Sequence, residues 1–544
     1  MKLHFTILFL LFFSITLFAQ DGNPTDYLKP DFHKTRREAF RVKMPENSVA
    51  VLFANPIRNR ANDVDYVYHQ DPNFYYLTGF KEPHSVVVIF SETQTNEEGN
   101  DYNEILYVQE KNARMELYNG NRLGAEGAKK ELGFDMAYFG TDFEMSGIDY
   151  GTFDKVMFFN FEDDYRKSNR DKADLFSLVE TFKTQANYNV EAYSNPMKDR
   201  AYEMIKVTEV ENSNNLVKDL GRALEYYPEL KEDKIISEYI NTTDNKTRIE
   251  LKNQVIKIEA ETPKSNLDIK TLTTIMGELR QIKTPEEMVL LTKAVRISAM
   301  GQREIMKAMH PGMSETEIQG IHEYVYKKYG SEYEGYPSIV GAGNNACVLH
   351  YIDNSKLKVE NDLVLMDLGA EYHGYTADVT RTIPASGKFT TEQKIIYDLV
   401  YESQEAGIAS AIVGNPHNST DTACREVITK GLLKLGIIKS EEDSRKYFPH
   451  GTSHYIGLDV HDAGLYGPLQ ANMVITVEPG IYIPDGSDCD EKWWGIGVRI
   501  EDDILITDNG PVNLSAEAPR KSEEIEKLMK EKSALNNFNL PSLD

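Results

Sequence analysis

Short apolar runs alternate with amphipathic segments in the first third of the chain. The runs cover residues 48–54, 85–91, 104–108 and 155–161, and they are rich in valine, isoleucine, leucine and phenylalanine. Runs of this length and composition are typical of strands, whereas the segment 122–132 is typical of a helix. Strands and helices in alternation predict an α/β domain, which we place at residues 21–200.

Residues 201–270 follow a different pattern. They are polar and rich in lysine and glutamate, and aromatic residues are few after Tyr239. The pattern predicts mostly helical, solvated structure. We interpret the segment as an insertion or connector, and it contains no motif that indicates chemistry.

Strong helix-start signals open the next part of the chain. Thr284 is a capping residue, Glu287 completes a capping box, and apolar residues recur at helical spacing across residues 288–299. Ser314 and Glu317 repeat the same box before another amphipathic stretch. Two consecutive helices are therefore predicted here.

Four β-type runs come next, and two further helices separate the second run from the third. The runs are residues 363–370, 375–383, 472–483 and 497–507, and the helices are expected at about 391–412 and 420–436. Helices that alternate with antiparallel-looking strand pairs predict an α+β domain, which we place at residues 271–520. Residues 521–544 form a polar, partly helical tail.

The first twenty residues are typical of a secretory signal. Lys2 precedes an apolar run from Phe5 to Phe18, and Ala19 provides a small residue at the cleavage point. The alternative is a membrane anchor, but the run is short for a span of about 20 residues. We expect residues 1–20 to be removed on export to the periplasm or the medium. No later stretch is apolar enough to span a membrane.

The net charge, the length and the cysteine content limit the binding partners, the number of domains and the disulfides that we expect. The net charge of −26 disfavours binding to nucleic acid and to anionic lipid. The chain's 544 residues are too many for one ordinary core, which agrees with two domains. Its three cysteines, Cys347, Cys424 and Cys489, lie far apart and form no CxxC pair. An exported protein could link two of them, and spacing does not choose which. Buried free thiols are the expectation.

Two aspartates in the β-type runs are candidates for one site. Asp367 and Asp378 are eleven residues apart and Gly374 lies between them. A hairpin that turned near His373–Gly374 would bring the two aspartates opposite each other. Glu478 and Glu501, near the ends of later runs, and His454 are further side chains of metal-ligand type.

Each of these residues has an ordinary alternative, because acids in strands are usually solvated and a histidine is more often structural than a ligand. Asp367 and Glu478, however, are embedded in very apolar runs. Burying a carboxylate there costs several kcal/mol unless a cation compensates it. Four such carboxylates need about four positive charges, which two divalent metal ions supply. Oxygen donors with one imidazole suit Mn²⁺, Co²⁺ or Fe²⁺, and Zn²⁺ stays open.

Several longer motifs resemble one enzyme family. They are LHY at 349–351, the run at 366–382, HGTSHYIGLDVHD at 450–462, VEPGIY at 477–482 and GVRIEDD at 497–503. Together they resemble the pita-bread metallopeptidases, and within these the Xaa-Pro aminopeptidases (aminopeptidase P). The resemblance covers roughly residues 275–515, and residues 60–83 resemble the family's N-terminal domain. It implies an α/β domain followed by an α+β catalytic domain of the pita-bread fold.

Carried over residue by residue, the resemblance implies two metal ions and the side chains around them. The ligands would be Asp367, Asp378, His454, Glu478 and Glu501, with Asp378 and Glu501 bridging, Asp367 on one ion, and His454 and Glu478 on the other. Around them, His350 and His461 would contact substrate, Arg499 and Tyr482 would orient ligands, Tyr336 would line the substrate pocket, and Asp63 would pair with Arg499. His450 would line the pocket, and a packed structural role is its alternative. Glu478 is also the expected proton carrier.

The implied activity is release of the N-terminal residue from peptides with proline in the second position. Manganese is the expected metal, with zinc and cobalt as alternatives, and the resemblance implies dimers or tetramers. Prolidase, which shares nearly all of these motifs but cuts Xaa-Pro dipeptides, is one alternative function. A metal-free binding module on the same fold is another. The intact set of five ligands disfavours a creatine-type amidinohydrolase.

Overall fold

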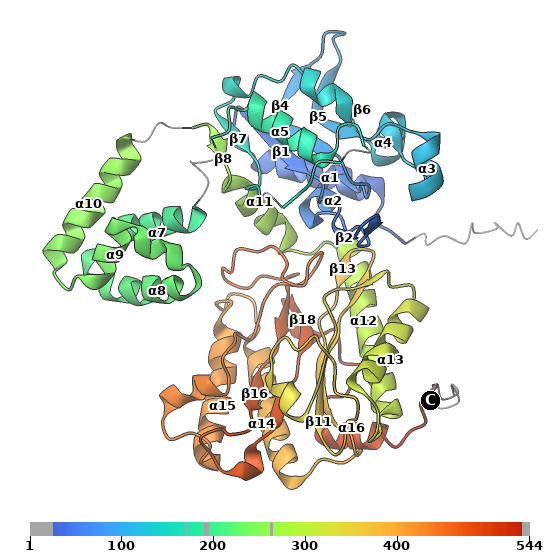
Figure 1. Cartoon of the computed structure of the whole chain (residues 1–544), viewed down its shortest axis with the longest axis vertical. Coiled ribbons are helices and arrows are strands. Elements are labelled where there is room, and N and C mark those ends of the chain that lie inside the picture. The colour runs from blue at the N-terminus through green and yellow to red at the C-terminus, as the bar shows by residue number, and fades with distance from the viewer. Residues whose placement is uncertain (1–25, 163, 169–170, 190–194, 262–264, 536–544) are drawn as a thin grey trace, which may run out of the picture.

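The computed structural model describes residues 26–162, 164–168, 171–189, 195–261 and 265–535. The expected signal peptide, residues 1–20, lies outside them, as do residues 536–544 of the expected tail. Within the described residues no helix has both the length and the apolar character that a membrane span requires. Figure 1 shows an α/β domain above a larger α+β domain, as expected for this fold class.

A mixed six-stranded sheet forms the N-terminal domain. Its order is β6 (Met136–Phe139), β5 (Asp101–Val108), β4 (Val86–Thr95), β1 (Ser48–Phe53), β7 (Lys155–Met157) and β8 (Leu267–Asp268). The inner pairs β1·β4 and β4·β5 are antiparallel, and the remaining pairs are parallel. All four predicted strands are present, but the last one stops at Met157. Beyond it, Phe158 stacks on Phe161 and packs against Phe182.

Different helices pack against the two faces of this sheet. The helices of the domain are α1 (Pro30–Lys43), α2 (Pro72–Thr78), α3 (Ala113–Asn119), α4 (Gly124–Leu132), α5 (Leu175–Gln185) and α11 (Thr271–Arg280). Ala50 and Leu52 of β1 share a core with α1, α2, α4 and α11, whereas Val49 and Val51 pack with α5. The first of these cores continues into the second domain, so the domains share buried apolar surface.

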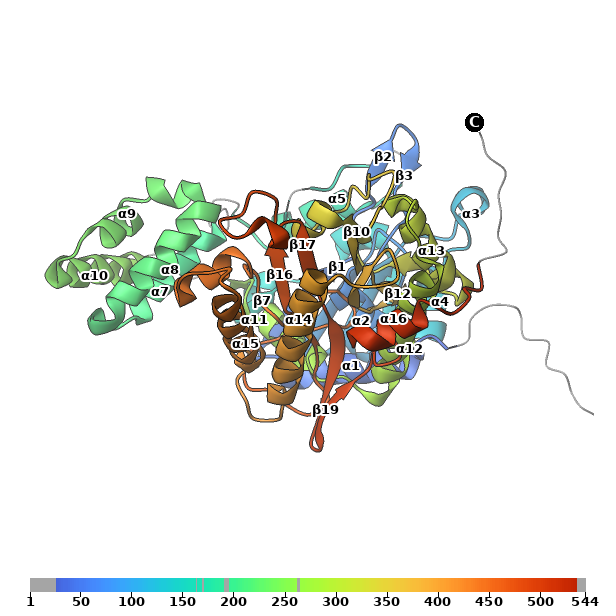
Figure 2. The same cartoon turned by 90° about the horizontal axis from the view of Figure 1, so that it is seen from below.

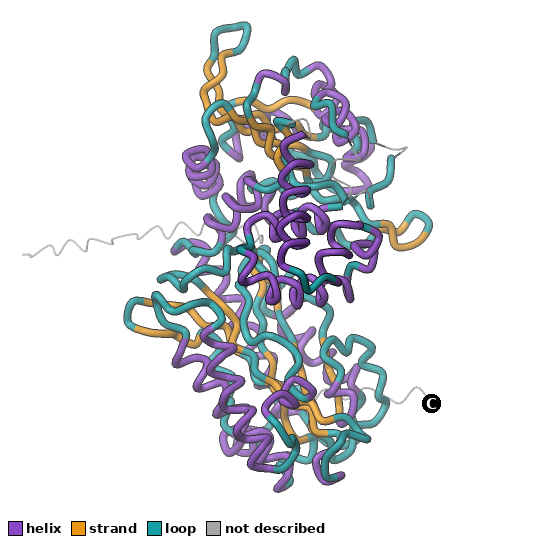
Figure 3. Tube along the Cα trace, turned by 90° about the vertical axis from the view of Figure 1, so that its left-hand side faces the viewer, coloured by secondary structure: helices purple, strands orange, loops and turns teal. Residues whose placement is uncertain are grey.

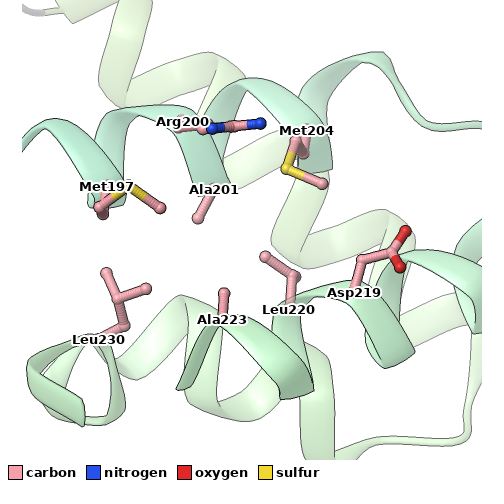
Figure 4. Close-up of a pocket in the computed structure, with 8 residues that line it drawn as sticks. All are labelled: Met197, Arg200, Ala201, Met204, Asp219, Leu220, Ala223 and Leu230. Carbon is pink, nitrogen blue, oxygen red and sulfur yellow. The ribbon is translucent and has the colours of Figure 1, made fainter. Parts of the chain in front are cut away.

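Residues 196–261 form a helical unit that projects sideways from the first domain (Figures 1 and 2). It consists of α7 (Pro196–Val207), α8 (Ser213–Tyr226), α9 (Lys234–Asn241) and α10 (Asn245–Glu261), and Figure 3 shows it as a bundle. The unit has its own small core, and a cavity of about 370 Å³ lies between α7 and α8, lined by Met197, Met204 and Leu220 among others (Figure 4). Because β8 rejoins the N-terminal sheet after these helices, the unit interrupts the first domain.

Two helix pairs enclose the strands of the catalytic domain (Figure 1). The pairs are α12 (Pro285–Ala308) with α13 (Glu315–Lys328), and α14 (Thr391–Ser410) with α15 (Ser419–Leu435); α16 (Ser522–Leu528) follows at the end. The strands form small antiparallel sheets. One consists of β10 (Ile339–Ala342), β11 (Leu363–Asp367) and β14 (Thr380–Pro384), and another of β9 (Tyr333–Glu334), β12 (Ala370–Tyr372) and β13 (Tyr375–Thr376). A further sheet contains β15 (Val474–Val477), β18 (Asp502–Thr507) and β19 (Gly510–Asn513), and β16 (Gly480–Ile483) pairs with β17 (Ile496–Arg499).

The predicted helix starts are present, with one difference. Thr284 Oγ1 accepts from the Glu287 backbone N–H at 3.3 Å, and the Glu287 carboxylate accepts from the Thr284 N–H at 2.9 Å, which completes the capping box. Glu287 also accepts from the Tyr375 hydroxyl, so the cap reaches the hairpin that follows β11. At Ser314 the hydroxyl caps α13, but no return bond from Glu317 is present among the described residues.

The contact between α12 and α13 depends on a glycine. A Cβ on Gly301 of α12 would lie 2.3 Å from the His322 ring, which is fully buried on α13. We therefore expect Gly301→Ala to lower the free energy of unfolding by about 1–3 kcal/mol through overpacking. The matched control is Gly320→Ala on α13, where a Cβ meets nothing within 4 Å. That change should raise stability by up to about 1 kcal/mol. Thermal unfolding of both variants measures the difference, and equal shifts would contradict the packing argument.

Candidate metal centre

A tight hairpin delivers the first two carboxylates. The predicted turn is present, with His373 and Gly374 at φ +51° and +90° between β12 and β13, a left-handed pair typical of two-residue hairpins. The prediction that the two aspartates lie directly opposite each other is wrong. The register pairs Asp367 with Thr380, and Asp378 lies two residues further along, on the diagonal. The cause is that the register set by a two-residue turn continues unchanged into β11 and β14.

Both aspartates nevertheless contact one donor. The Tyr336 hydroxyl lies 2.5 Å from Oδ1 of Asp367 and 2.6 Å from Oδ1 of Asp378. A hydroxyl has a single proton, so it donates to one of them at a time. Tyr336, expected in the substrate pocket, thus holds the two carboxylates beside each other.

The other carboxylates and the histidine come from later strands. Glu478 follows the last residue of β15, and Glu501 sits between β17 and β18. Ligand atoms of Asp378, His454 and Glu501 all lie within 4.8 Å of one another, and His454 Nε2 is 3.6 Å from Oε1 of Glu478. His454 Nδ1 lies 3.0 Å from the carbonyl oxygen of the next residue, a contact that leaves Nε2 to face the carboxylates.

Asp367 is oriented by an arginine. Arg499 donates through Nη2 to Oδ2 of Asp367 at 2.6 Å and through Nη1 to the Tyr482 hydroxyl at 3.0 Å. Arg499 is therefore placed to orient Asp367, and Tyr482 is placed to orient Arg499.

Asp63 lies on the exposed hairpin of β2 (Asn59–Ala61) and β3 (Val64–Asp65), and no contact between it and Arg499 is present in the described part of the chain.

The electrostatics of the cluster fit divalent cations. Burial, together with neighbouring carboxylates, raises the pKa of Asp378 and of Glu501 well above the ordinary range, and burial also raises that of Glu478. Burial opposes ionisation of Asp367 too, but Arg499 and Tyr336 bring its pKa below the usual value. One guanidinium does not balance four buried carboxylates. Oxygen donors with one imidazole are the ligands that hard or borderline divalent metals prefer, so the residues present fit metal.

Three further histidines surround the cluster. The His461 ring lies 4.3 Å from that of His454, and burial and the His454 charge lower its pKa. His450 Nε2 lies 2.8 Å from the Tyr482 hydroxyl, and burial lowers the His450 pKa to about 3. His350 is exposed at the rim, and its charge contributes to the lowered pKa of both His450 and His461. With the exception of Asp63, the candidate side chains thus gather around one centre.

The sequence analysis missed the supports beneath Glu501 and Asp378. Thr380 donates to Oε2 of Glu501 at 2.6 Å, and Asp503 accepts from the Asp378 backbone N–H at 3.1 Å. Arg381 and Asp502, both fully buried, form an ion pair at 2.7 Å next to Glu501. The signal was present in part, because Asp502 and Asp503 directly follow Glu501 and Arg381 lies in the same β-type run as Asp378.

Comparison with known proteins places both domains. A family model described as "Metallopeptidase family M24" matches residues 289–508, and one described as "Aminopeptidase P, N-terminal domain" matches residues 33–147. The helical unit lies between these ranges. An Xaa-Pro aminopeptidase of Escherichia coli is 32% identical over 91% of this chain and 96% of its own length. Human Xaa-Pro aminopeptidase 3 is 28% identical over 90% and 82%, respectively.

Solved structures agree with this similarity. The structure of E. coli aminopeptidase P with the inhibitor Pro-Leu has a TM-score of 0.70 and 30% identity, and the match covers 92% of this chain and 98% of that one. A zinc-substituted form of the same enzyme in complex with product gives the same TM-score of 0.70.

Metal should stabilise this protein more strongly as the pH rises. Folding raises the pKa of Asp378 and Glu501, so without metal their contribution to stability is greatest at acid pH and is lost as pH rises through the raised values. Bound cations stabilise the ionised carboxylates and reverse this loss. We expect the gain in Tm on adding Mn²⁺ to a chelator-treated sample to grow from pH 5 to pH 8. At 100 times the dissociation constant the gain corresponds to about 2.7 kcal/mol.

Differential scanning calorimetry with Mn²⁺ and with EDTA measures this gain at each pH. Asp378→Asn is the matched control, and its gain should be small at every pH because one of the clustered carboxylates is gone. An equal gain at pH 5 and pH 8 in the unmodified protein would contradict the assignment.

Proposed function

The chain belongs to metallopeptidase family M24, and we propose that it is an exported Xaa-Pro aminopeptidase that uses two divalent metal ions. The observation that carries this proposal is the similarity over 91% of the chain together with five side chains of metal-ligand type that lie close to one another. Export rests on the signal-like residues 1–20. Mn²⁺ is the metal we propose, with Zn²⁺ and Co²⁺ as the alternatives, and self-association as dimers or tetramers stays a prediction.

The metal ions would be held by the five side chains of the cluster. We assign Asp378 and Glu501 to both ions, Asp367 to one, and His454 and Glu478 to the other. Bound there, two divalent ions supply an activated water and polarise the scissile carbonyl. Arg499 and Tyr336 fix the orientation of Asp367 through contacts of 2.6 and 2.5 Å, so the site is preorganised before the substrate arrives.

Glu478 is the residue that we propose to move the proton. Its carboxylate lies beside His454 and 3.5 Å from His450, and burial raises its pKa. A carboxyl group positioned in this way can take up a proton and release it during the reaction. It would take a proton from the attacking water at Oε2 and pass it to the leaving nitrogen. His461 and His350, at the open side of the cluster, would donate to the carbonyl oxygen as negative charge develops on it.

A prolyl substrate poses a particular recognition problem. Its scissile nitrogen is tertiary and has no N–H, so the enzyme has to recognise the shape of the ring. The rings of His450 and Tyr482 lie 5.5 Å apart and form an aromatic wall beside Glu478, which we propose packs against the proline. The hydroxyl of Tyr482 is already engaged by Arg499 and His450, so the wall is rigid.

Hydrolysis of paired substrates tests the proposed function. We expect release of the first residue from a tripeptide Xaa-Pro-Yaa in the presence of Mn²⁺, and loss of that activity with EDTA. Cleavage of the Xaa-Pro dipeptide alone would make the protein a prolidase. Metal binding without turnover of either peptide would overturn the substrate, and the absence of both metal binding and turnover would favour a non-catalytic binding module.

The role of Glu478 predicts a specific kinetic defect. We expect Glu478→Gln to lower kcat for an Xaa-Pro-Yaa peptide by about 10²- to 10⁴-fold, the range typical of removing a general acid–base group. The KM should change much less, because the aromatic wall and the histidines remain. Metal content by mass spectrometry is measured in parallel. A variant that keeps its metal and retains nearly full kcat would exclude Glu478 as the proton carrier.

A further inference from the structure

A second cavity, of about 260 Å³, lies where the two domains meet. One side of it comes from the first domain, chiefly from α2 and the residues just before and after that helix. The other side comes from β9, the β12–β13 hairpin and the segment that follows His454. Figure 1 shows β13 at this boundary. None of the five candidate metal ligands lines the cavity, so it is separate from the metal centre.

Tyrosine rings form much of the cavity wall, and contacts hold them in place. The Tyr27 ring stacks on the His373 ring with 3.6 Å between their centroids, and the Tyr27 hydroxyl donates to Glu332 at 3.0 Å. The Tyr333 hydroxyl donates to the backbone oxygen of Tyr68 at 3.3 Å, a bond that joins the two domains. The wall therefore offers fixed apolar surface to a ligand.

Three polar groups of the cavity have no hydrogen-bond partner among the described residues. Two of them are the Tyr75 hydroxyl and Oε1 of Glu371, although each of these residues is only 6% exposed. The other carboxylate oxygen of Glu371 lies 2.9 Å from Nε2 of His69. The third group is the ammonium of Lys81, which lies 3.4 Å from the centroid of the Tyr27 ring. Buried polar groups are nearly always hydrogen-bonded, so Tyr75 and Glu371 point to a partner from outside the chain.

The two free charges of the cavity have opposite signs. Glu332 is already engaged, because it accepts from the Tyr27 hydroxyl and from the His373 backbone N–H. Lys81 and Glu371 are left as one cation and one carboxylate with unused hydrogen-bonding capacity. A ligand with an ammonium and a carboxylate would satisfy both, whereas a simple anion or a simple cation would satisfy one of them.

We propose that this cavity binds a free amino acid with an apolar side chain. The ligand carboxylate pairs with Lys81 and accepts from the Tyr75 hydroxyl, its ammonium donates to Oε1 of Glu371, and its side chain packs against the tyrosine rings. Cavities for drug-sized ligands measure about 300–1,000 Å³, so a volume of about 260 Å³ suits a smaller molecule. The proposed function would supply such a ligand, since each cut releases one free amino acid, but binding itself does not rest on that function.

Calorimetry with three matched ligands tests the cavity. L-Phenylalanine has both charges, phenethylamine lacks the carboxylate, and 3-phenylpropanoate lacks the ammonium. Each is titrated into the full chain, both metal-loaded and after EDTA treatment, because an amino acid held by the metal ions is lost with them. We expect L-phenylalanine to bind both forms with a Kd of about 0.1–1 mM, as suits a ligand of this size. The other two ligands should bind about 10-fold more weakly.

Three variants connect the binding to the cavity. Lys81→Met and Glu371→Gln each remove one free charge at nearly constant size, and each should weaken binding of L-phenylalanine about 10-fold. Tyr75→Phe removes only the hydroxyl and should weaken it about 5-fold. Lys439→Met is the matched control, since the Lys439 side chain is 80% exposed and lies outside the cavity, and it should leave the Kd unchanged.

The outcomes separate this cavity from the metal centre and from the activity. Absence of binding, loss of all binding with EDTA, or equal affinity for the three ligands overturns the proposal, and so does an unchanged Kd in Lys81→Met and Glu371→Gln. If the charge variants or the metal-free chain do not stay folded in thermal unfolding, Tyr75→Phe in the metal-loaded chain decides, because it keeps the ring. A chain that cleaves no prolyl tripeptide but binds L-phenylalanine as expected loses the proposed function and keeps the cavity's ligand.

Discussion

The catalytic domain is organised around a local imbalance of charge. Within the described residues, Asp367, Asp378, Glu478 and Glu501 converge in a buried place where Arg499 is the balancing cation. Removing carboxylates from water costs several kcal/mol each unless they are compensated, and packing alone does not repay that cost. Bound divalent cations would supply that compensation at neutral pH, where protonation of the carboxylates is costly. Three of the four carboxylates stand at strand ends, since Asp367 ends β11, Glu478 follows β15 and Glu501 lies between β17 and β18.

The sequence allowed the elements and the members of the site to be predicted, because both depend on local signals. Thr284 and Glu287 cap α12 through contacts within one turn, and the His373–Gly374 turn needs only two residues with positive φ. The motif resemblance supplied the ligands in the same way, residue by residue. Interactions between residues that are close in the sequence can be predicted without knowing which distant segment packs against them.

Features that depend on distant segments were not predictable. The pairing of Asp367 with Thr380 belongs to the local features instead, because counting outward from the two-residue turn at His373–Gly374 leads directly to it. The Arg381–Asp502 ion pair joins residues from separate runs, and so do the four hydrogen bonds that the Glu315 carboxylate accepts. The same holds between the domains. Arg280, the last residue of α11, contacts Asn73 of the first domain and pairs with Asp462, the neighbour of His461. Relative movement of the domains would therefore shift Asp462 and the neighbouring His461.

The position of the helical unit has a consequence for how the chain is made. The sheet of the first domain is encoded in two pieces, since β7 precedes the unit and its neighbour β8 follows it. During synthesis the edge of β7 stays unpaired until the ribosome has delivered all four helices and β8 after them. The unpaired backbone groups of an exposed strand edge can form hydrogen bonds with a strand of another chain, which leads to aggregation. The helical unit has its own small core, in which its first and last helices, α7 and α10, contact each other, so the chain returns toward the sheet and β8 can pair with β7.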